Sequence, residues 1–274
     1  MKVGFVQLEP SFGSVDKNIE KAEKLIDSAD ANLLVLPELF NTGYVFTSKE
    51  EAIALSEEIP DGKTTQALMR IAKNNDVFLV AGLAEKNGNK LFNSAVIVSP
   101  EGYLGTYRKI HLFFEEKLWF DPGDAEAAVY DIGQYKFGVM ICFDWFFPET
   151  MRVLSLKGAH IICHSANLVL PFCQDAMKTR CLENRVFAVT ANRTGTETRG
   201  EKSLQFTGKS QVISPNADIL CQAGSDTEEV EIVDIDMEMA ANKRLNEYND
   251  LFADRRPEFY GRLVNKKNKE AFQK

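Results

Sequence analysis

The sequence predicts an α/β protein whose strands form mixed β-sheets. Three observations support this fold class. Short apolar runs typical of buried strands recur along the chain, helical patterns lie between several of them, and tight turn sequences lie between others. Helical connections favour parallel strand pairs, whereas tight turns join antiparallel ones. Because both kinds of connection occur, we expect parallel and antiparallel pairs in the same sheets.

The expected strands follow the apolar runs along the chain. They cover residues 3–8, 33–36, 77–81, 94–98, 137–141, 160–164, 187–191, 209–213 and 230–234. Asn87-Gly88 and Pro100-Glu101-Gly102 are turn sequences that separate three successive strand-like stretches, the last of them at residues 103–106. This part of the chain is therefore expected to form an antiparallel meander rather than β-α-β units.

Helical patterns occupy several of the longer connections. Residues 15–29 and 64–74 show the clearest helical periodicity. Pro148 fits the first turn of a helix, which predicts a helix from there to about residue 157, and another is expected at residues 177–185. No linker, repeat or low-complexity segment divides the 274 residues, so residues 1–274 are expected to form a single domain.

Charge and cysteine content limit the partners and the compartment. The chain has 40 acidic and 32 basic residues, a net charge of −8, which disfavours a nucleic-acid backbone as a partner. No apolar run reaches membrane-spanning length, and no secretory signal precedes the first strand. The five cysteines lack Cys-x-x-Cys spacing, which favours a reducing compartment. We expect a cytoplasmic protein that binds neither nucleic acid nor membrane.

No cofactor or metal is expected. The sequence lacks a Walker A loop and the Gly-x-Gly-x-x-Gly, His-Glu-x-x-His and Gly-x-Ser-x-Gly motifs. The three histidines, His111, His160 and His164, are more simply interpreted as structural hydrogen-bonding residues than as metal ligands.

The most informative residue is Cys142, which ends the apolar run 137–141. Open α/β sheets place their active sites at the carboxyl ends of core strands. The turn that follows such a strand leaves the next backbone N–H, that of Phe143, available to bind an oxyanion. By its position alone, however, Cys142 is more simply a buried structural cysteine, since free cysteine is among the most buried residue types.

Glu38 is the first of two features that favour a chemical role for Cys142. Pro37 cannot donate a hydrogen bond to a sheet, so it ends the run 33–36 and leaves Glu38 among apolar neighbours. Desolvation there would raise the pKa of the carboxyl towards the range of a general base. The alternative is a helix-capping or surface glutamate.

The second feature is the basic string Tyr107-Arg108-Lys109-Ile110-His111-Leu112, which follows a strand-like stretch. Taken alone, such a basic pair is usually a solvated face. Taken with Cys142 and Glu38, it supplies the cation that a nucleophilic site needs for its developing oxyanion.

This combination resembles the nitrilase superfamily of carbon–nitrogen hydrolases, in particular an amidase-like branch close to archaeal-type nitrilases and aliphatic amidases. The main motifs are Pro37-Glu38, Tyr107-Arg108-Lys109-Ile110-His111-Leu112, and Cys142-Phe143-Asp144 followed by Phe147-Pro148-Glu149. Further similar strings are Gly4-Phe5-Val6-Gln7, Leu182-Glu183-Asn184-Arg185, Ala191-Asn192-Arg193-Thr194-Gly195, Asn246 and Asp254-Arg255-Arg256. The resemblance therefore covers nearly the whole chain.

The resemblance implies a fold and an assembly. The family fold is a four-layer α-β-β-α sandwich, with two mixed sheets face to face and helices outside. Family members commonly dimerise by packing helical layers and exchanging tail segments. A homodimer or larger homo-oligomer is therefore implied, with residues 262–274 as a flexible or dimer-exchanging tail.

The resemblance also assigns roles to the candidate residues. Cys142 would be the nucleophile that forms a thioester, Glu38 the general base, and Lys109 the cation facing the tetrahedral intermediate. The Phe143 N–H would share the oxyanion, and Lys109 would help to stabilise the thiolate. A second glutamate belongs to the family site. Glu116 fits the family spacing better than Glu115, which is the alternative.

The implied activity is hydrolysis of a non-peptide carbon–nitrogen bond in a small amide. Cys142-Phe143-Asp144 is similar to the string of amide hydrolases, whereas true nitrilases more often carry Cys-Trp-Glu. A nitrilase, an N-carbamoyl amine amidohydrolase and a non-catalytic dimeric binding protein are the alternatives. Relatives that bind a substrate carboxylate often carry an arginine where this chain has Trp145 and Phe146. A neutral or cationic aliphatic amide, or a carbamoyl amine, is therefore expected.

Substrate-binding residues are predicted among the side chains near these motifs. An apolar pocket could be lined by Phe113, Phe114, Trp119, Phe120, Trp145 and Phe172, although ordinary core packing would use the same residue types. Asn167 and Gln174 could offer hydrogen bonds to a substrate.

Overall fold

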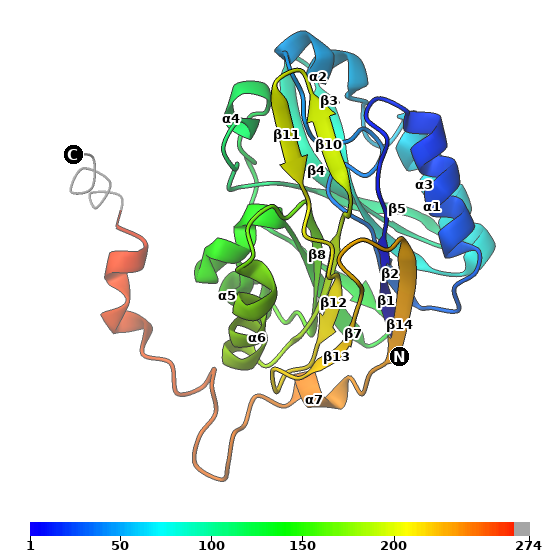
Figure 1. The fold of residues 1–274 in the computed structure, drawn as a ribbon. Coiled ribbons are helices and arrows are strands. Elements are labelled where there is room, and N and C mark those ends of the chain that lie inside the picture. The colour runs from blue at the N-terminus through cyan, green and yellow to red at the C-terminus, as the bar shows by residue number, and fades with distance from the viewer. Residues whose placement is uncertain (266–274) are drawn as a thin grey trace. The chain divides into compact units, whose positions relative to one another are not determined.

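The computed structural model of the chain describes residues 1–265 and divides into two compact units, Met1–Ala241 and Asn242–Lys274. The first unit contains two large sheets and the helices that cover them (Figure 1). In the second unit, the described residues form two short 3-10 helices, η2 (Pro257–Phe259) and η3 (Gly261–Leu263). Residues 266–274, the greater part of the expected tail, lie outside the described residues. Tail exchange and a single domain over residues 1–274 stay predictions.

The first sheet has six strands in the order β14-β1-β2-β3-β4-β5. Their bounds are β1 (Lys2–Gln7), β2 (Leu33–Val35), β3 (Phe78–Asn87), β4 (Lys90–Ser99), β5 (Gly102–Arg108) and β14 (Glu229–Asp234). β1, β2 and β3 are parallel, whereas β3, β4 and β5 form the expected antiparallel meander. Its first turn contains Gly88, whose φ of +59° suits a residue without a side chain.

The second sheet also has six strands, in the order β13-β12-β9-β8-β7-β6. Their bounds are β6 (Val129–Ile132), β7 (Tyr135–Ile141), β8 (Ile161–Ala166), β9 (Phe187–Asn192), β12 (Gln211–Ile213) and β13 (Ile219–Gln222). The central strands β7, β8 and β9 are parallel, and the outer pairs are antiparallel. Both sheets are therefore mixed, as predicted.

The two sheets pack face to face through apolar side chains. β1 contacts β9, β3 contacts β8, and β4 contacts β7. Val35 and Ile97 of the first sheet share one buried cluster with Phe137, Val139 and Ile161 of the second. Burial of this shared layer is the main favourable contribution to folding that the sequence provides.

Helices cover the outer face of each sheet. α1 (Val15–Ile26) and α3 (Lys63–Asn75) pack on the first sheet, and α5 (Pro148–Leu156) and α6 (Cys173–Asn184) pack on the second. Close packing of α5 depends on Gly138 of β7, because a Cβ there would lie 2.9 Å from a methyl carbon of Leu154. The four-layer α-β-β-α sandwich is thus confirmed.

Some elements differ from the predicted ones. α1 ends at Ile26 rather than residue 29, because the Ala29 N–H returns to the Ile26 carbonyl in a turn. β12 begins at Gln211 because Gly208 and Lys209 both have positive φ. The hairpin of β10 (Thr196–Arg199) and β11 (Lys202–Gln205) was missed because its strands are polar and lack an apolar run.

Short helices complete the described elements. They are α2 (Lys49–Leu55), α4 (Glu116–Trp119), α7 (Glu238–Ala241) and the 3-10 helix η1 (Cys142–Phe146). Within residues 1–265, no helix combines the length and apolarity needed to cross a membrane.

Candidate active site

The candidate catalytic residues follow three different strands and lie close together. Glu38 follows β2, Lys109 follows β5 of the same sheet, and Cys142 follows β7 of the facing sheet. Lys109 Nζ lies 2.6 Å from Glu38 Oε1. Asn167 links the two sheets, because its side chain donates to the Glu38 carbonyl at 2.8 Å and its own carbonyl lies 3.8 Å from Cys142 Sγ.

Glu38 is completely buried, and its two carboxylate oxygens differ in their surroundings. Oε1 accepts hydrogen bonds from Lys109 Nζ and from Asn93 Nδ2, the latter at 2.7 Å. Oε2 is buried without a hydrogen-bond partner among the described residues. Burial raises the pKa of Glu38 to about 7, against the opposing effect of the Lys109 ammonium.

The backbone around Glu38 depends on a glycine in the neighbouring strand. A Cβ on Gly82 of β3 would lie 2.5 Å from the Glu38 Cα. Only a residue without a side chain lets the two segments approach this closely.

Lys109 is held between two carboxylates. Its Nζ donates to Glu38 Oε1 at 2.6 Å and to Glu116 Oε1 at 2.7 Å. Glu116 Oε1 also accepts from the Tyr44 hydroxyl at 2.7 Å, and Glu116 Oε2 accepts from the Phe113 N–H at 3.1 Å. Burial opposes the charge on Lys109, but Glu116 and Glu38 outweigh it and raise the pKa of Lys109 above its usual value. Lys109 is therefore an ammonium at neutral pH.

The structure distinguishes the two adjacent glutamates. Glu116 is buried and touches Lys109, whereas Glu115 forms a partly exposed ion pair with Lys202 of β11, at 2.7 Å. Glu116 is therefore the glutamate that lies beside the buried lysine.

Cys142 lies at the junction of β7 and η1 in a left-handed conformation, with φ of +40°. Few residues other than glycine adopt this conformation, and it concentrates at functional sites. Burial and the Glu38 carboxylate raise the pKa of the Cys142 thiol well above its usual value, and the lowering effect of Lys109 does not offset them. Lys109 favours the thiolate, as expected, but burial and Glu38 outweigh its effect on the pKa, and the thiol needs a base.

Asp144 ties the lysine segment to the cysteine turn. Its buried carboxylate accepts from the Tyr107 hydroxyl at 2.7 Å and from the Ile141 N–H at 2.9 Å. It also accepts from the His111 N–H at 3.2 Å and lies 2.8 Å from His111 Nδ1. Tyr107 and His111 flank Lys109 in sequence, so one carboxylate fixes the position of Lys109 relative to Cys142.

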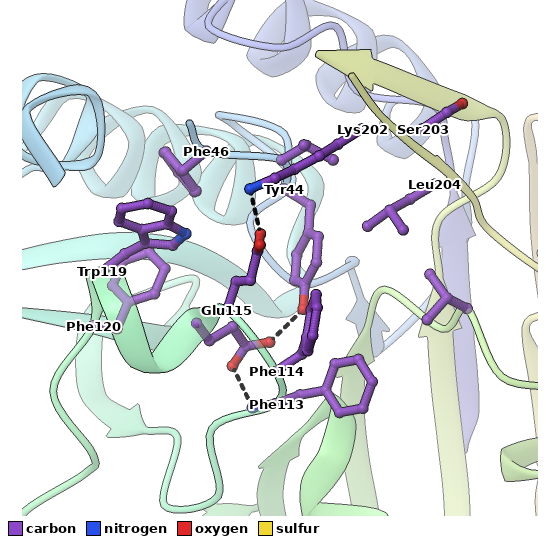
Figure 2. A pocket seen from close by; sticks show the side chains of 13 residues that line it. Tyr44, Phe46, Phe113, Phe114, Glu115, Trp119, Phe120, Lys202, Ser203 and Leu204 are labelled. Atoms are coloured by element: carbon purple, nitrogen blue, oxygen red, sulfur yellow. Dashed lines mark hydrogen bonds and ion pairs between the residues drawn. The ribbon is translucent and has the colours of Figure 1, made fainter. Parts of the chain in front are cut away.

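A mostly apolar cavity of about 290 Å³ adjoins these residues (Figure 2). Its lining includes Tyr44, Phe46, Phe113, Phe114, Trp119, Phe120, Val169 and Leu204, with Glu115 and Lys202. A smaller cavity lined by Cys142, Phe143, Trp145 and Asn167 shares Phe113 and Val169 with it. The two cavities are therefore adjacent, and Cys142 lines the smaller one.

The structure brings some of the predicted substrate-binding residues to a cavity and not others. Phe114 lines the larger cavity, and Trp145 and Asn167 line the smaller one. Phe172, however, is 58% exposed at the N-terminal end of α6 and lines neither cavity, so the structure does not bring it to the site. Gln174 bonds to Thr207 and Gly208 instead.

Tyr44, Asn93, Val169 and Leu204 were not predicted as site residues. Tyr44 lies in an irregular loop shortly after Glu38 but 72 residues before Glu116, and only the fold places its hydroxyl on Glu116. Asn93 had a usable signal, because a buried polar residue within the apolar run Leu91-Phe92-Asn93-Ser94-Ala95 needs a specific partner.

The described residues contain no cluster of three or more histidine, cysteine, aspartate or glutamate side chains that could hold a metal ion.

Comparison with protein families matches residues 2–244 to the carbon–nitrogen hydrolase model. The chain belongs to the carbon–nitrogen hydrolase family. It is 52% identical to a nitrilase from Pyrococcus abyssi over 96% of this chain and 100% of that protein. It is 34% identical to an (R)-stereoselective amidase from Pseudomonas sp over 93% of this chain and 92% of that protein.

A solved structure shows the same carbon–nitrogen hydrolase fold. A carbon–nitrogen hydrolase from Helicobacter pylori G27 superimposes with a TM-score of 0.88 and 26% identity, covering 97% of this chain and 99% of that one. The family resemblance and the sandwich fold predicted from the sequence are both confirmed. The protein is therefore a hydrolase of carbon–nitrogen bonds, and Cys142 lies within the matched region.

Proposed function

We propose that the protein hydrolyses small uncharged amides through a thioester on Cys142, releasing ammonia or an amine and a carboxylic acid. The observation that carries this proposal is that Asn167 contacts both the Glu38 carbonyl and Cys142 Sγ, while Lys109 bonds to the Glu38 carboxylate. Burial raises the pKa of that carboxyl to about 7. A base of this pKa is suited to accept the thiol proton near neutral pH.

The first half of the reaction forms the acyl-enzyme. Cys142 Sγ attacks the amide carbon while Glu38 takes the thiol proton. The amide oxygen becomes an oxyanion that the Lys109 ammonium and the Phe143 N–H stabilise. Glu38 then gives its proton to the amide nitrogen, the carbon–nitrogen bond breaks, and ammonia or an amine leaves a thioester on Cys142.

The second half hydrolyses that thioester. Glu38, again a carboxylate, takes a proton from water as the water oxygen attacks the thioester carbon. The same two groups hold the second oxyanion. The carbon–sulfur bond breaks, the proton returns from Glu38 to sulfur, and the carboxylic acid leaves. Glu116 and Tyr44 keep Lys109 in place throughout, because Glu116 bonds to both of them.

The lining of the larger cavity supports an uncharged, apolar acyl group. Its walls are mainly aromatic and aliphatic, and its charged side chains are already paired, Glu116 with Lys109 and Glu115 with Lys202. A substrate carboxylate would have to displace one of these pairs. The 34% identical relative named as an amidase is consistent with this substrate class.

A nitrile is the second candidate substrate, because the relative with 52% identity is named a nitrilase. Cys142 would add to the nitrile carbon to give a thioimidate, and water would then release ammonia and the same thioester. A panel of matched pairs, butyramide with butyronitrile and phenylacetamide with phenylacetonitrile, distinguishes the two. Ammonia release from the amides supports the proposal, release from the nitriles alone supports the second candidate, and persistence in Cys142→Ala contradicts both.

We also propose a cytoplasmic homodimer. Five unpaired cysteines, four of them buried, suit a reducing compartment. Exposed apolar side chains on the outer helices, Val153 and Leu156 of α5 and Leu182 of α6, offer a surface for a second copy. Light scattering of the purified protein tests this, since a monomeric mass at micromolar concentration would contradict it.

A further inference from the structure

His164 is buried in the centre of the second sheet with both ring nitrogens in contact with polar partners. It lies on β8 and is in register with Met140 of β7 and Thr190 of β9. Its Nε2 lies 2.9 Å from the carbonyl oxygen of Cys142, and its Nδ1 lies 3.2 Å from Thr190 Oγ1. The proposed reaction has so far used neither contact.

The two contacts define the protonation of the ring. A carbonyl oxygen only accepts hydrogen bonds, so Nε2 carries a proton and donates it to Cys142. Burial lowers the pKa of His164 to about 4, so the ring is neutral near pH 7. In a neutral ring with a protonated Nε2, Nδ1 is an acceptor, and the Thr190 hydroxyl donates to it.

The bond to His164 fixes the peptide that joins Cys142 to Phe143. This peptide is trans. In a planar trans peptide the C=O and the N–H point in opposite directions. Because His164 holds the carbonyl towards β8, the Phe143 N–H points away from His164. Phe143 and Cys142 line the small cavity in which the reacting carbon would lie.

The conformation of Cys142 makes this bond more important. A non-glycine residue at φ of +40° persists only where its surroundings hold it there. If the peptide turned over, the Cys142 carbonyl would replace the Phe143 N–H, and a partial negative charge would face the developing oxyanion. The His164 donor opposes this rotation.

We propose that His164 is a positioning residue that, supported by Thr190, aims the Phe143 N–H at the oxyanion by holding the Cys142 carbonyl. It does not touch the substrate. This inference rests on the proposed role of Cys142 as the nucleophile.

Four variants test the proposal. His164→Leu removes the donor, whereas His164→Gln keeps an N–H donor at a similar reach. Thr190→Val removes only the hydroxyl that supports the ring and is the mild variant if His164→Leu does not fold. Cys163→Ala is the matched control, because it truncates a buried neighbour on the same strand that makes no polar contact with the site.

Two chemical probes separate positioning from general damage. Iodoacetamide alkylates Cys142 by displacement at a CH₂ group and forms no oxyanion. Butanal adds to the thiol, so that a carbon–sulfur bond forms, the carbonyl oxygen takes the negative charge, and the thiol proton passes through Glu38 to that oxygen. Protection of Cys142 from iodoacetamide by butanal therefore measures the oxyanion site without any turnover.

We expect His164→Leu and Thr190→Val to change butanal protection but not the rate of alkylation by iodoacetamide. His164→Leu should weaken butanal protection and lower kcat for amides about 10- to 100-fold, less than the 10²–10³-fold cost of deleting a donor outright. The iodoacetamide rate should stay within about threefold of that of the parent protein, and His164→Gln should recover most of the loss. Thr190→Val should shift butanal protection in the same direction by a smaller factor, and Cys163→Ala should shift neither probe.

Two results would overturn the inference. One is unchanged butanal protection in His164→Leu, or in Thr190→Val where the leucine variant does not fold. The other is an equal fall in protection and in alkylation rate, which is the pattern of a loosened fold. Because the butanal assay needs no hydrolysis, a parent protein that binds butanal but releases no ammonia from amides would refute the proposed substrate class and still test His164.

Discussion

Glu38 bonds to Lys109 through one carboxylate oxygen and keeps the other without a partner among the described residues. Lys109 Nζ lies 2.6 Å from Oε1, whereas Oε2 is buried and unpaired. The ion pair fixes the position of the carboxylate, and the unpaired oxygen is available to take a proton. The same side chain can therefore hold the lysine and act as the base for Cys142.

The pH dependence of the reaction follows from the environment of Glu38. Burial raises the pKa of this carboxyl to about 7, and only its deprotonated form can accept the thiol proton. We expect kcat/KM to fall about tenfold per pH unit below pH 7 and to level off above it. A pH profile from 4 to 9 measures this, and a limb near the ordinary glutamate value of 4.5 would contradict the assignment.

The two adjacent glutamates should differ strongly in their effect on catalysis. Glu116→Gln removes a charge that bonds to buried Lys109, so we expect kcat to fall at least tenfold. Glu115→Gln is the matched comparison, because this carboxylate also lines the larger cavity but pairs with the partly exposed Lys202 and not with Lys109. Its effect on kcat should stay within about threefold, as for most exposed ion pairs. Equal losses in the two variants would refute the distinction.

Asp144 should contribute to stability more than a typical polar residue. It is fully buried and accepts from Tyr107, Ile141 and His111. In Asp144→Asn the new NH₂ group would face these donors, so we expect a loss of about 2–3 kcal/mol in the free energy of unfolding.

Tyr107→Phe is the milder test of the same network, because it removes one donor and leaves the carboxylate in place. We expect it to cost about 1 kcal/mol. Urea denaturation of both variants measures the two values, and an unfolding free energy of Asp144→Asn equal to that of the parent would contradict this role.

The larger cavity should set the size of the acyl group. Leu204 lines it, and Leu204→Trp would fill much of its volume of about 290 Å³. We expect kcat/KM for phenylacetamide to fall at least tenfold relative to acetamide, since steric overlap excludes only the larger group. Leu220→Trp on β13, a leucine that does not line this cavity, is the control. Parallel changes for both amides would show that substrates use another route.

Much of the fold could be predicted from local patterns. The apolar runs at β1, β2, β7, β8 and β9 predicted buried strands because these strands are covered on both faces. The polar hairpin of β10 and β11 could not be predicted in this way, since its pairing depends on neighbours that are distant in sequence.

In the candidate site, too, some residues could be predicted from local sequence and others depend on the fold. Cys142 directly follows β7, and Glu38 comes shortly after β2 behind Pro37, so both could be predicted from the apolar runs that precede them. Tyr44 reaches Glu116 only because Glu197 of β10 holds its loop by accepting from the Tyr44 and Val45 N–H groups. The raised pKa of the Cys142 thiol could not be predicted from the sequence, because it depends on complete burial and on the nearby Glu38 carboxylate, which only the fold provides.

The central claim is that Cys142 carries the acyl group, and intact-protein mass spectrometry tests it most directly. Parent protein mixed with phenylacetamide and quenched in acid within milliseconds should show an added phenylacetyl mass that peptide mapping places on Cys142. The adduct and ammonia release should both be absent from Cys142→Ala. Ammonia release that persists in Cys142→Ala, or an acyl group found on another residue, would contradict the account.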